Sequence, residues 1–268
     1  MKWLRRLWPI VLLLLAPILA RAATPQAPRE LHVYAAASLA DAFGELGRAM
    51  EARTPGLRVR FHFGGSQALA MQLAQGAKGD VFASADERWM QDAAGHALLE
   101  GDAAAFARNR LVVIVPRTNP GRIGSLRDLA RGGLKLVLGA DAVPVGRYAR
   151  VALRQLGADP ALGPDYAVRV LRNVVSEEEN VKSVVGKVQL GEADAGIVYA
   201  SDVTPAVARF VRAIEIPTAA NVIATYPIAV LRGAPRPEDA RAFVALVRSD
   251  EGQRVLAKWK FLPAEAGR

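Results

Sequence analysis

Residues 33–43, VYAAASLADAF, run a short apolar segment into three alanines and then place one hydroxyl side chain, Ser38, before a segment with helical periodicity. An apolar strand followed at once by an amphipathic helix is the repeating unit of α/β folds. The sequence Ser38-Leu39-Ala40-Asp41 also has the pattern of a capping box, and serine is a common helix cap. This stretch alone predicts a cap without a ligand.

The alternation of strand and helix continues along the chain. Strand-like runs at 57–63, 80–85, 134–140, 166–171 (YAVRVL) and 195–201 stand between helices predicted at 39–53, 67–75, around Glu87, 147–156 and 181–190. The pattern predicts an α/β fold with mainly parallel sheets flanked by helices. No internal repeat is visible.

Two apolar strands, NRLVVIVPRT (109–118) and ATYPIAVLRG (224–233), are not followed at once by a helix. We interpret them as crossovers between two lobes, with a hinge between them. The first lobe is expected to contain residues 23–109 and 226–268, and the second residues 110–225. Two C-terminal helices, the first starting at Pro237, are expected to complete the first lobe.

The first 22 residues have the features of an export signal: a basic start, an apolar stretch at 7–20 and the pattern Ala20-Arg21-Ala22. That stretch is shorter than the ~20 residues of a spanning helix. We therefore predict a signal peptide at 1–22 and a monomeric protein of the periplasm. The chain has no cysteine, which excludes disulfides, thiolate metal ligands and lipid attachment through cysteine.

The positive charge of the chain is mild once the signal is set aside. The full chain has a formal net charge of +9. Segment 1–22 holds four basic residues and no acid, so the chain without it has a formal net charge of +5. The remaining basic residues form no run with interleaved aromatics, so nucleic-acid binding is not expected.

Four strand-to-helix turns of this sequence favour an anion. Ser66 follows Gly64-Gly65 just as Ser38 follows the alanines, so two strands would aim hydroxyl and N–H groups at one sheet edge, where open α/β sheets bind ligands. Near Pro144 and Gly146, the N–H of Val145 is expected to be free. Asn180 is a candidate helix cap that would leave the N–H of Val181 free, although Ser176 and Glu179 offer a competing capping box.

Tyr199, at the end of AGIVY, would add a neutral phenol at the same edge. Each turn on its own also fits an ordinary structural role: a cap, a solvated loop or a core tyrosine.

The motifs AAASL, FGGSQAL, GDVFASAD followed by Trp89-Met90, VPVGRYA and GIVYASD resemble, in order and spacing, the periplasmic molybdate-binding proteins of ABC transporters. The resemblance covers essentially the whole chain after the signal. It implies a two-lobed type II solute-binding protein that closes on molybdate or tungstate and delivers the anion to an inner-membrane ABC permease. No cofactor is implied.

The resemblance implies that neutral donors hold the anion, at the positions Ser38, Ser66, Val145, Val181 and Tyr199. Two departures stand out. The family often has serines where this chain has Gly64-Gly65, and a smaller residue at Val145.

Alternative functions stay open at this point. The site could take another oxyanion, such as sulfate, or a small carboxylate. A hydrolase or transferase with a catalytic serine is a further alternative, but no histidine stands in these motifs to activate Ser38 or Ser66, and no enzyme motif is present, so we do not expect an enzyme.

Several charged residues have simpler interpretations. We expect Arg147 to lie on an exposed helix face, and Glu177, Glu178 and Glu179 to form a solvated turn. No two histidines are expected to meet, so a cation site is not predicted.

Overall fold

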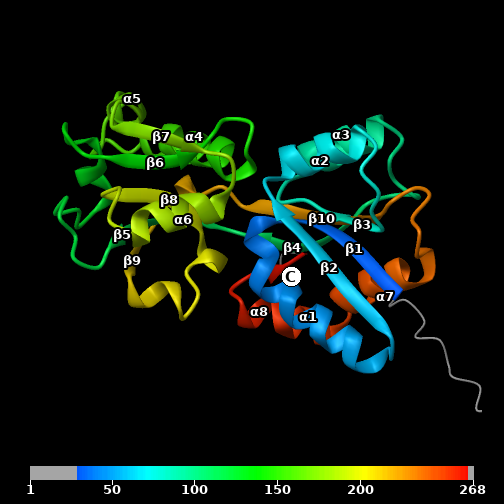
Figure 1. The fold of residues 1–268 in the computed structure, drawn as a ribbon. Coiled ribbons are helices and arrows are strands. Elements are labelled where there is room, and N and C mark those ends of the chain that lie inside the picture. Colours follow the sequence, from blue (N-terminus) through cyan, green and yellow to red (C-terminus); the bar gives the residue numbers. More distant parts are fainter. Residues whose placement is uncertain (1–28, 265–268) are drawn as a thin grey trace, which may run out of the picture.

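The computed structural model describes residues 29–264, so the predicted signal at 1–22 lies outside the described residues. The strands form two separate sheets that stand side by side, each with its own helices (Figure 1). We call each sheet together with its helices a half of the molecule: the six-stranded half and the five-stranded half.

The six-stranded sheet has the order β11-β4-β10-β3-β1-β2. Strand β1 pairs in parallel with β2 and β3, whereas β10 runs antiparallel to β3 and β4. The strands are β1 (Arg29–Ala36), β2 (Leu57–Gly64), β3 (Val81–Ala83), β4 (Ala104–Asn109), β10 (Ala224–Val230) and β11 (Leu262–Pro263).

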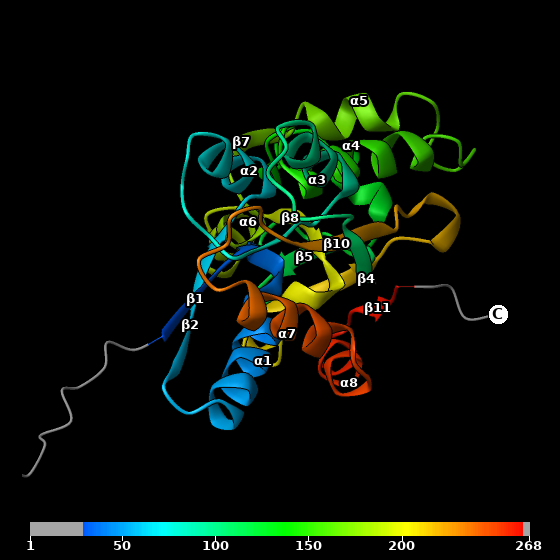
Figure 2. The ribbon, with the colours of Figure 1, turned by 90° about the vertical axis from the view of Figure 1, so that its right-hand side faces the viewer.

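Helices cover both faces of this sheet (Figures 1 and 2). On one face lie α1 (Ala40–Arg53), α7 (Pro237–Arg248) and α8 (Asp250–Lys258), and on the other α2 (Ser66–Ala74) and α3 (Glu87–Gly95). The buried residues of α1 recur every three to four positions, as expected of a helix with one apolar face. Phe43 of α1 meets Phe243 of α7 edge to face, with ring centres 5.5 Å apart.

The five-stranded sheet has the order β7-β6-β8-β5-β9. Its strands are β5 (Leu111–Pro116), β6 (Leu136–Gly139), β7 (Val174–Glu178), β8 (Ala195–Tyr199) and β9 (Val211–Glu215). Helices α4 (Pro144–Leu156) and α6 (Val181–Gln189) pack on β6 and β8, and α5 (Tyr166–Leu171) packs on α4. All residues of β5 are buried, as its continuous apolar sequence predicts for an internal strand.

Short 3-10 helices complete the description: η1 (Ala37–Leu39), η2 (Leu126–Ala130), η3 (Ala200–Asp202), η4 (Val207–Arg209) and η5 (Thr218–Ala220). No helix within residues 29–264 has the length and apolar character needed to cross a bilayer.

The chain passes between the halves twice. Strand β4 ends in the six-stranded sheet at Asn109, and β5 begins in the five-stranded sheet at Leu111; the chain returns between β9 and β10. Both sheets are mixed, where the sequence predicted mainly parallel ones. The physical reason is that β5 and β10 enter directly from the other half, without the crossover helix that a parallel connection requires.

One predicted strand is a helix. YAVRVL forms α5, in which Tyr166, Ala167 and Val170 are buried at helical spacing. The hydroxyl of Tyr166 donates to the carbonyl of Leu126 at 2.6 Å, which ties α5 to η2. The prediction of a strand from the apolar and β-branched residues of this segment was wrong.

Candidate functional site

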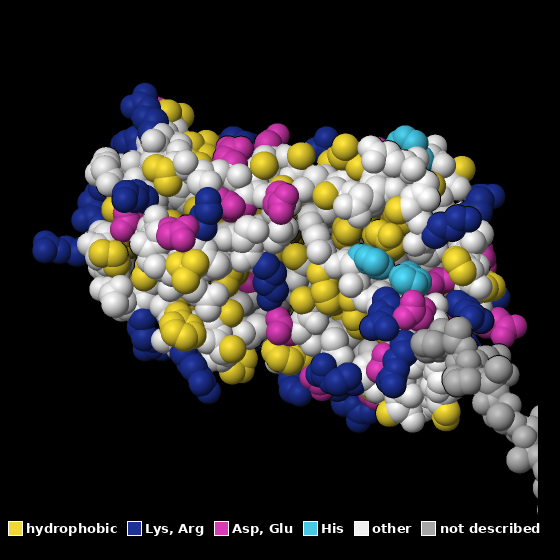
Figure 3. Space-filling model, viewed as in Figure 1, with side chains coloured by type: hydrophobic (Ala, Val, Ile, Leu, Met, Phe, Trp, Pro, Cys, Tyr) yellow, Lys and Arg dark blue, Asp and Glu magenta, His cyan; other side chains and the backbone are white. Residues whose placement is uncertain are grey.

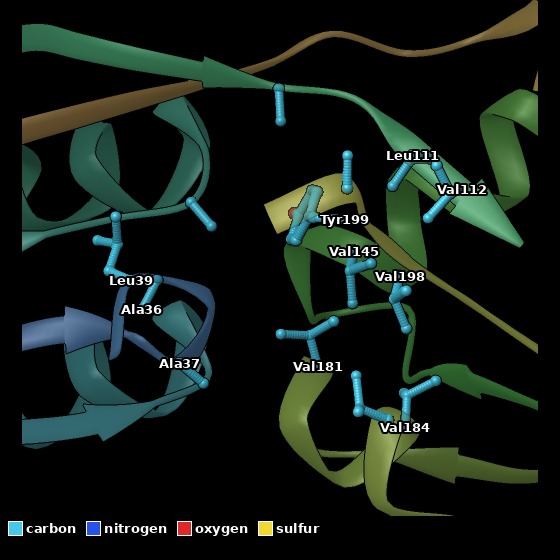
Figure 4. Packing of buried hydrophobic residues seen from close by; sticks show 14 of the residues in the cluster. Ala36, Ala37, Leu39, Leu111, Val112, Val145, Val181, Val184, Val198 and Tyr199 are labelled. Atoms are coloured by element: carbon cyan, nitrogen blue, oxygen red, sulfur yellow. The ribbon is translucent and has the colours of Figure 1, made fainter. Parts of the chain in front are cut away.

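A small cavity lies between the two halves, next to the ends of β1, β2 and β8 and the starts of α2, α4 and α6. Ala36 and Ala37 of the six-stranded half face Val145, Val181 and Tyr199 of the five-stranded half (Figure 4). Register explains the six-stranded side, because Ala36 of β1 pairs with Gly64 of β2, so both strands end at one edge. The lining residues are Ala36, Ala37, Ser38, Gly64, Gly65, Ser66, Ala85, Val143, Pro144, Val145, Val181 and Tyr199.

The structure brings the five predicted binding residues together in this cavity: Ser38, Ser66, Val145, Val181 and Tyr199. None of the residues that line it carries a charged side chain. Outside the cavity, Lys and Arg side chains are interspersed with Asp and Glu over both halves of the visible face (Figure 3). The cavity therefore offers small apolar walls and uncharged donors.

Ser38 does not cap the helix that follows it. It lies inside η1, and α1 begins after Leu39 without a side-chain cap, so the predicted capping box is wrong. The Ser38 hydroxyl instead lies 2.9 Å from the hydroxyl of Tyr226, a residue of β10. Both side chains are buried. The interposed 3-10 turn carries Ser38 away from the start of α1 and into the cavity wall.

Ser66 is the first residue of α2, after Gly65. Its oxygen accepts a hydrogen bond from the N–H of Ala85 at 3.0 Å, which leaves the hydroxyl hydrogen of Ser66 free for the cavity. Gly65 permits a close approach of the two halves, because a Cβ there would lie 2.3 Å from the carbonyl oxygen of Glu179.

The start of α4 supplies a main-chain donor. Pro144 is the first residue of α4 and Val145 the second, so the N–H of Val145 has no acceptor within its own helix. A Cβ on Gly146 would lie 2.1 Å from the carbonyl oxygen of Gly139, so glycine lets this turn pack against the end of β6.

The start of α6 supplies a second main-chain donor. Asn180 caps the helix by accepting from the N–H of Ser183 at 3.1 Å, and Val181 is the first helical residue, as predicted. The competing capping box is excluded because Ser176 and Glu178 lie in β7, where the Ser176 hydroxyl donates to Glu178. The prediction of a turn at Glu177–Glu179 was wrong for the same reason, because β7 extends to Glu178, although Glu177 and Glu179 are exposed to solvent as expected.

Tyr199 ends β8 with its side chain fully buried. Within the described residues, its hydroxyl has no hydrogen-bond partner. Burial raises the pKa of this phenol well above its ordinary value, so it stays protonated and neutral. A buried hydroxyl without a partner costs free energy, and this one belongs to a residue that lines the cavity.

Contacts between the halves surround the cavity. The indole N–H of Trp89 donates to the main-chain carbonyl of Ala142 at 2.9 Å. The side-chain amide of Gln67 donates to the main-chain carbonyl of Glu179 at 2.8 Å. Lys182 of α6 donates to Asp41 of α1 at 2.9 Å. The halves are therefore in direct contact in this structure.

Arg147 is part of this contact, which corrects the expectation of an arginine on an exposed face. Its guanidinium lies 3.0 Å from the buried carboxylate of Asp86, a residue of the other half that also caps α3. Partial burial works to lower the pKa of Arg147, but the hydrogen bond to Asp86, the negative charge of Asp86 and the neighbouring Tyr148 together outweigh it and raise the pKa. Arg147 does not line the cavity.

Two histidines do meet, contrary to the prediction. His32 and His62 lie on neighbouring strands with ring nitrogens 3.1 Å apart and rings nearly parallel. The ring centres are 5.4 Å apart. The two ring nitrogens are within hydrogen-bonding distance, and the tautomers of the two rings decide which nitrogen donates. Within residues 29–264, no group of three or more His, Cys, Asp or Glu side chains is arranged to hold a metal ion.

The sequence did not predict the residues that contact the lining residues or join the two halves beside the cavity. Tyr226 and Asn109 lie on the two strands where the chain changes halves, and Asp86 and Lys182 link the halves at the cavity's edge. Asp86 had a visible signal, since an acid directly before a helix is typical of a cap. For Tyr226, the sequence holds no comparable signal.

Comparison with known proteins places the chain in a family. Residues 31–262 match the family described as "Bacterial extracellular solute-binding protein". The molybdate-binding protein ModA of Mycobacterium tuberculosis is 42% identical over 241 residues, which is 90% of this chain and 87% of the relative.

Solved structures agree with this assignment. The substrate-binding domain of a putative molybdenum ABC transporter from Clostridium difficile is 26% identical, with a TM-score of 0.63 over 88% of this chain and 99% of that one. The periplasmic molybdate-binding protein of Azotobacter vinelandii has the same fold, with 18% identity, a TM-score of 0.74, and coverage of 88% and 100%. The chain belongs to the bacterial extracellular solute-binding proteins, in the family that contains the ModA molybdate-binding proteins.

Proposed function

We propose that this protein captures molybdate and tungstate in the cavity between its halves and delivers the anion to an inner-membrane ABC permease. The observation that carries the proposal is the buried hydroxyl of Tyr199, which has no hydrogen-bond partner within residues 29–264, in a cavity lined only by uncharged groups. The family relationship supports the same ligand, because a relative named for molybdate binding shares 42% of its residues with this chain.

Five donors hold the anion in this proposal. The hydroxyls of Ser38, Ser66 and Tyr199 and the N–H groups of Val145 and Val181 point hydrogens at its oxygens. The starts of α2, α4 and α6 add the partial positive charge of helix N-termini, which favours an anion.

Neutral donors are sufficient for tight binding. A hydrogen bond to a charged group contributes ~1.5–3 kcal/mol, so five of them supply on the order of 10 kcal/mol before the costs of desolvation and closure. Such a sum corresponds to dissociation constants from about micromolar to nanomolar. The absence of a cation among the lining residues also allows release, because a fixed positive charge would hold the dianion more strongly.

The two halves act as lobes that close on the anion, with bounds at 23–109 plus 226–268 and at 110–225. The two strand-to-strand passages, from β4 to β5 and from β9 to β10, are the hinge in this proposal. Residues 1–22 act as the export signal, and the mature protein works as a monomer in the periplasm. It catalyses no reaction and needs no cofactor.

Calorimetric titration of the mature protein with molybdate, tungstate, sulfate and phosphate tests the function. Molybdate and tungstate should bind most tightly, because the smaller sulfate cannot reach every fixed donor and protonated phosphate brings a hydrogen to a site of donors. Tighter binding of sulfate, or of a small carboxylate, would assign the protein to another ligand.

A further inference from the structure

The direction of one hydrogen bond decides what Ser38 offers to a ligand. A serine hydroxyl has one hydrogen and two lone pairs. Its oxygen lies 2.9 Å from the Tyr226 hydroxyl, and either atom can be the donor. If Ser38 donated to Tyr226, it would present only lone pairs to the cavity and repel an anion. If Tyr226 donates, the hydrogen of Ser38 is free for the anion.

Asn109 favours the second of these directions. The main-chain N–H of Arg110 donates to the side-chain oxygen of Asn109 at 3.0 Å, which fixes the amide with its NH₂ group on the other side. This NH₂ group donates to Ser201 at 2.8 Å and, in a longer contact of 3.5 Å, to the Tyr226 oxygen. The Tyr226 oxygen therefore already has an N–H donor beside it, which favours the arrangement in which its own hydrogen points to Ser38.

The surroundings of Tyr226 keep this hydrogen in place. Tyr226 is fully buried, and burial raises the pKa of its phenol well above the ordinary value. Its ring is held edge-on by three aromatic neighbours, with ring centres 5.4 Å from Phe261, 5.8 Å from Tyr199 and 6.3 Å from Phe106. The phenol thus stays protonated at neutral pH, and its oxygen is held within hydrogen-bonding reach of Ser38.

We propose that Tyr226 is a positioning residue that makes Ser38 an obligatory donor and so sets the anion selectivity of the cavity. The inference rests on the proposed function. Ser66 is arranged in the same way, since the N–H of Ala85 donates to its oxygen. With both serines forced to donate, the cavity favours an oxyanion that carries no hydrogen, such as molybdate, over hydrogen phosphate, which must donate one of its own.

The test is a double-mutant cycle on molybdate affinity, measured by calorimetry. Tyr226→Phe keeps the ring and removes the hydroxyl, so Ser38 can rotate; we expect molybdate to bind about fivefold more weakly, a fraction of the value of one hydrogen bond to a charged group. In the Ser38→Ala background the same substitution should change the affinity by less than about twofold, because its effect passes through Ser38. An equal loss in both backgrounds, or none in either, would overturn the proposal.

A second arm measures selectivity by displacing bound molybdate with hydrogen phosphate, at a pH where the phosphate is a singly protonated dianion. The ratio of phosphate to molybdate dissociation constants should fall in Tyr226→Phe, because a free Ser38 can accept the phosphate hydrogen. An unchanged ratio contradicts the inference.

Tyr166→Phe is the matched control, since it also removes a buried tyrosine hydroxyl with a hydrogen bond, but away from the cavity. It should lower the melting temperature without altering the molybdate affinity or the ratio of phosphate to molybdate dissociation constants. If the unsubstituted protein fails to bind molybdate, the proposed function fails. If it binds molybdate normally but Tyr226→Phe has the same effect with and without Ser38, only the role of Tyr226 is refuted.

Discussion

The Tyr199 hydroxyl gives the most direct test of a single donor. Because it is buried without a partner among the described residues, Tyr199→Phe should leave the ligand-free protein as stable as before or slightly more stable. The same substitution should weaken molybdate binding about tenfold to a hundredfold. Thermal unfolding and calorimetry measure the two effects. A large loss of stability without ligand, with affinity unchanged, would mean that the hydroxyl serves the fold.

Val181 allows a main-chain donor to be removed by itself. It is the first residue of α6, where proline is well tolerated, and the extended backbone of Asn180 suits a residue before proline. Val181→Pro should therefore keep the helix but lose the N–H, and calorimetry should show molybdate binding weakened about tenfold or more. Val181→Ala, which keeps the N–H, is the control and should bind nearly as before. Similar affinities of the two variants would rule out this donor.

At the scale of residues, the sequence identified the lining of the cavity but not what stands behind it. Motifs at strand ends indicated Ser38, Ser66 and Tyr199 because parallel strands end at a common edge. The partner of Ser38 could not be found this way. Tyr226 is 188 positions away, on a strand that returns from the other half, and short-range patterns carry no information on such a contact.

The contact between α4 and α3 is predicted to control how long the anion stays bound. Arg147 reaches Asp86 across the two halves, so Arg147→Gln should destabilise the closed form and raise the dissociation rate about tenfold, with little effect on association. Stopped-flow tryptophan fluorescence can follow this, since Trp89 also lies between the halves.

The control for this variant is Arg241→Gln, which breaks an ion pair with Glu100 inside one half. It should leave the dissociation rate unchanged. Equal rates for Arg147→Gln and the unsubstituted protein would show that the ion pair does not hold the halves together.

Asp202 in η3 predicts a pH dependence of stability. Burial, opposed by Lys182, raises the pKa of this carboxyl from an ordinary 3.8 to about 6. The folded state therefore binds the proton more tightly than the unfolded state. This tighter proton binding adds to the free energy of unfolding. The contribution is at its full value below about pH 4 and is lost as the pH rises through about 6.

Urea unfolding of Asp202→Asn and the unsubstituted protein checks this expectation. From about pH 4 to about pH 7, the free energy of unfolding of the unsubstituted protein should fall by on the order of 1–3 kcal/mol relative to that of the variant. A difference that stays constant over this range would contradict the pKa shift. Asparagine keeps an acceptor for the N–H of Tyr199, so the local fold is preserved.

At the scale of elements, periodicity predicted the long helices well and the short segments less well. Helix α1 was predicted at 39–53 and lies at Ala40–Arg53, whereas YAVRVL was predicted as a strand and forms α5. A run of six mostly apolar residues is too short to distinguish the period of a helix from that of a strand, so packing against η2 and α4 decides the outcome. The start of α4 was also missed, since Pro144 and Gly146 are typical of a turn.

At the scale of the whole molecule, the order of strands and helices indicated the α/β class, and the two helix-free strands indicated where the chain changes halves. The mixed character of the sheets was missed because strand direction depends on where each crossing strand enters, which periodicity does not encode. The contacts between the halves likewise join residues far apart in the sequence, so no local pattern predicts them.

The central claim is that uncharged hydroxyl and N–H donors from both halves together hold a tetrahedral dianion. Anomalous diffraction from a crystal grown with tungstate tests it most directly, because the metal scatters strongly. We expect one dominant peak in the cavity, within hydrogen-bonding reach of Ser38, Ser66 and Tyr199 through the tungstate oxygens. A dominant peak anywhere else, or one whose oxygens contact lysine or arginine side chains, would contradict the account.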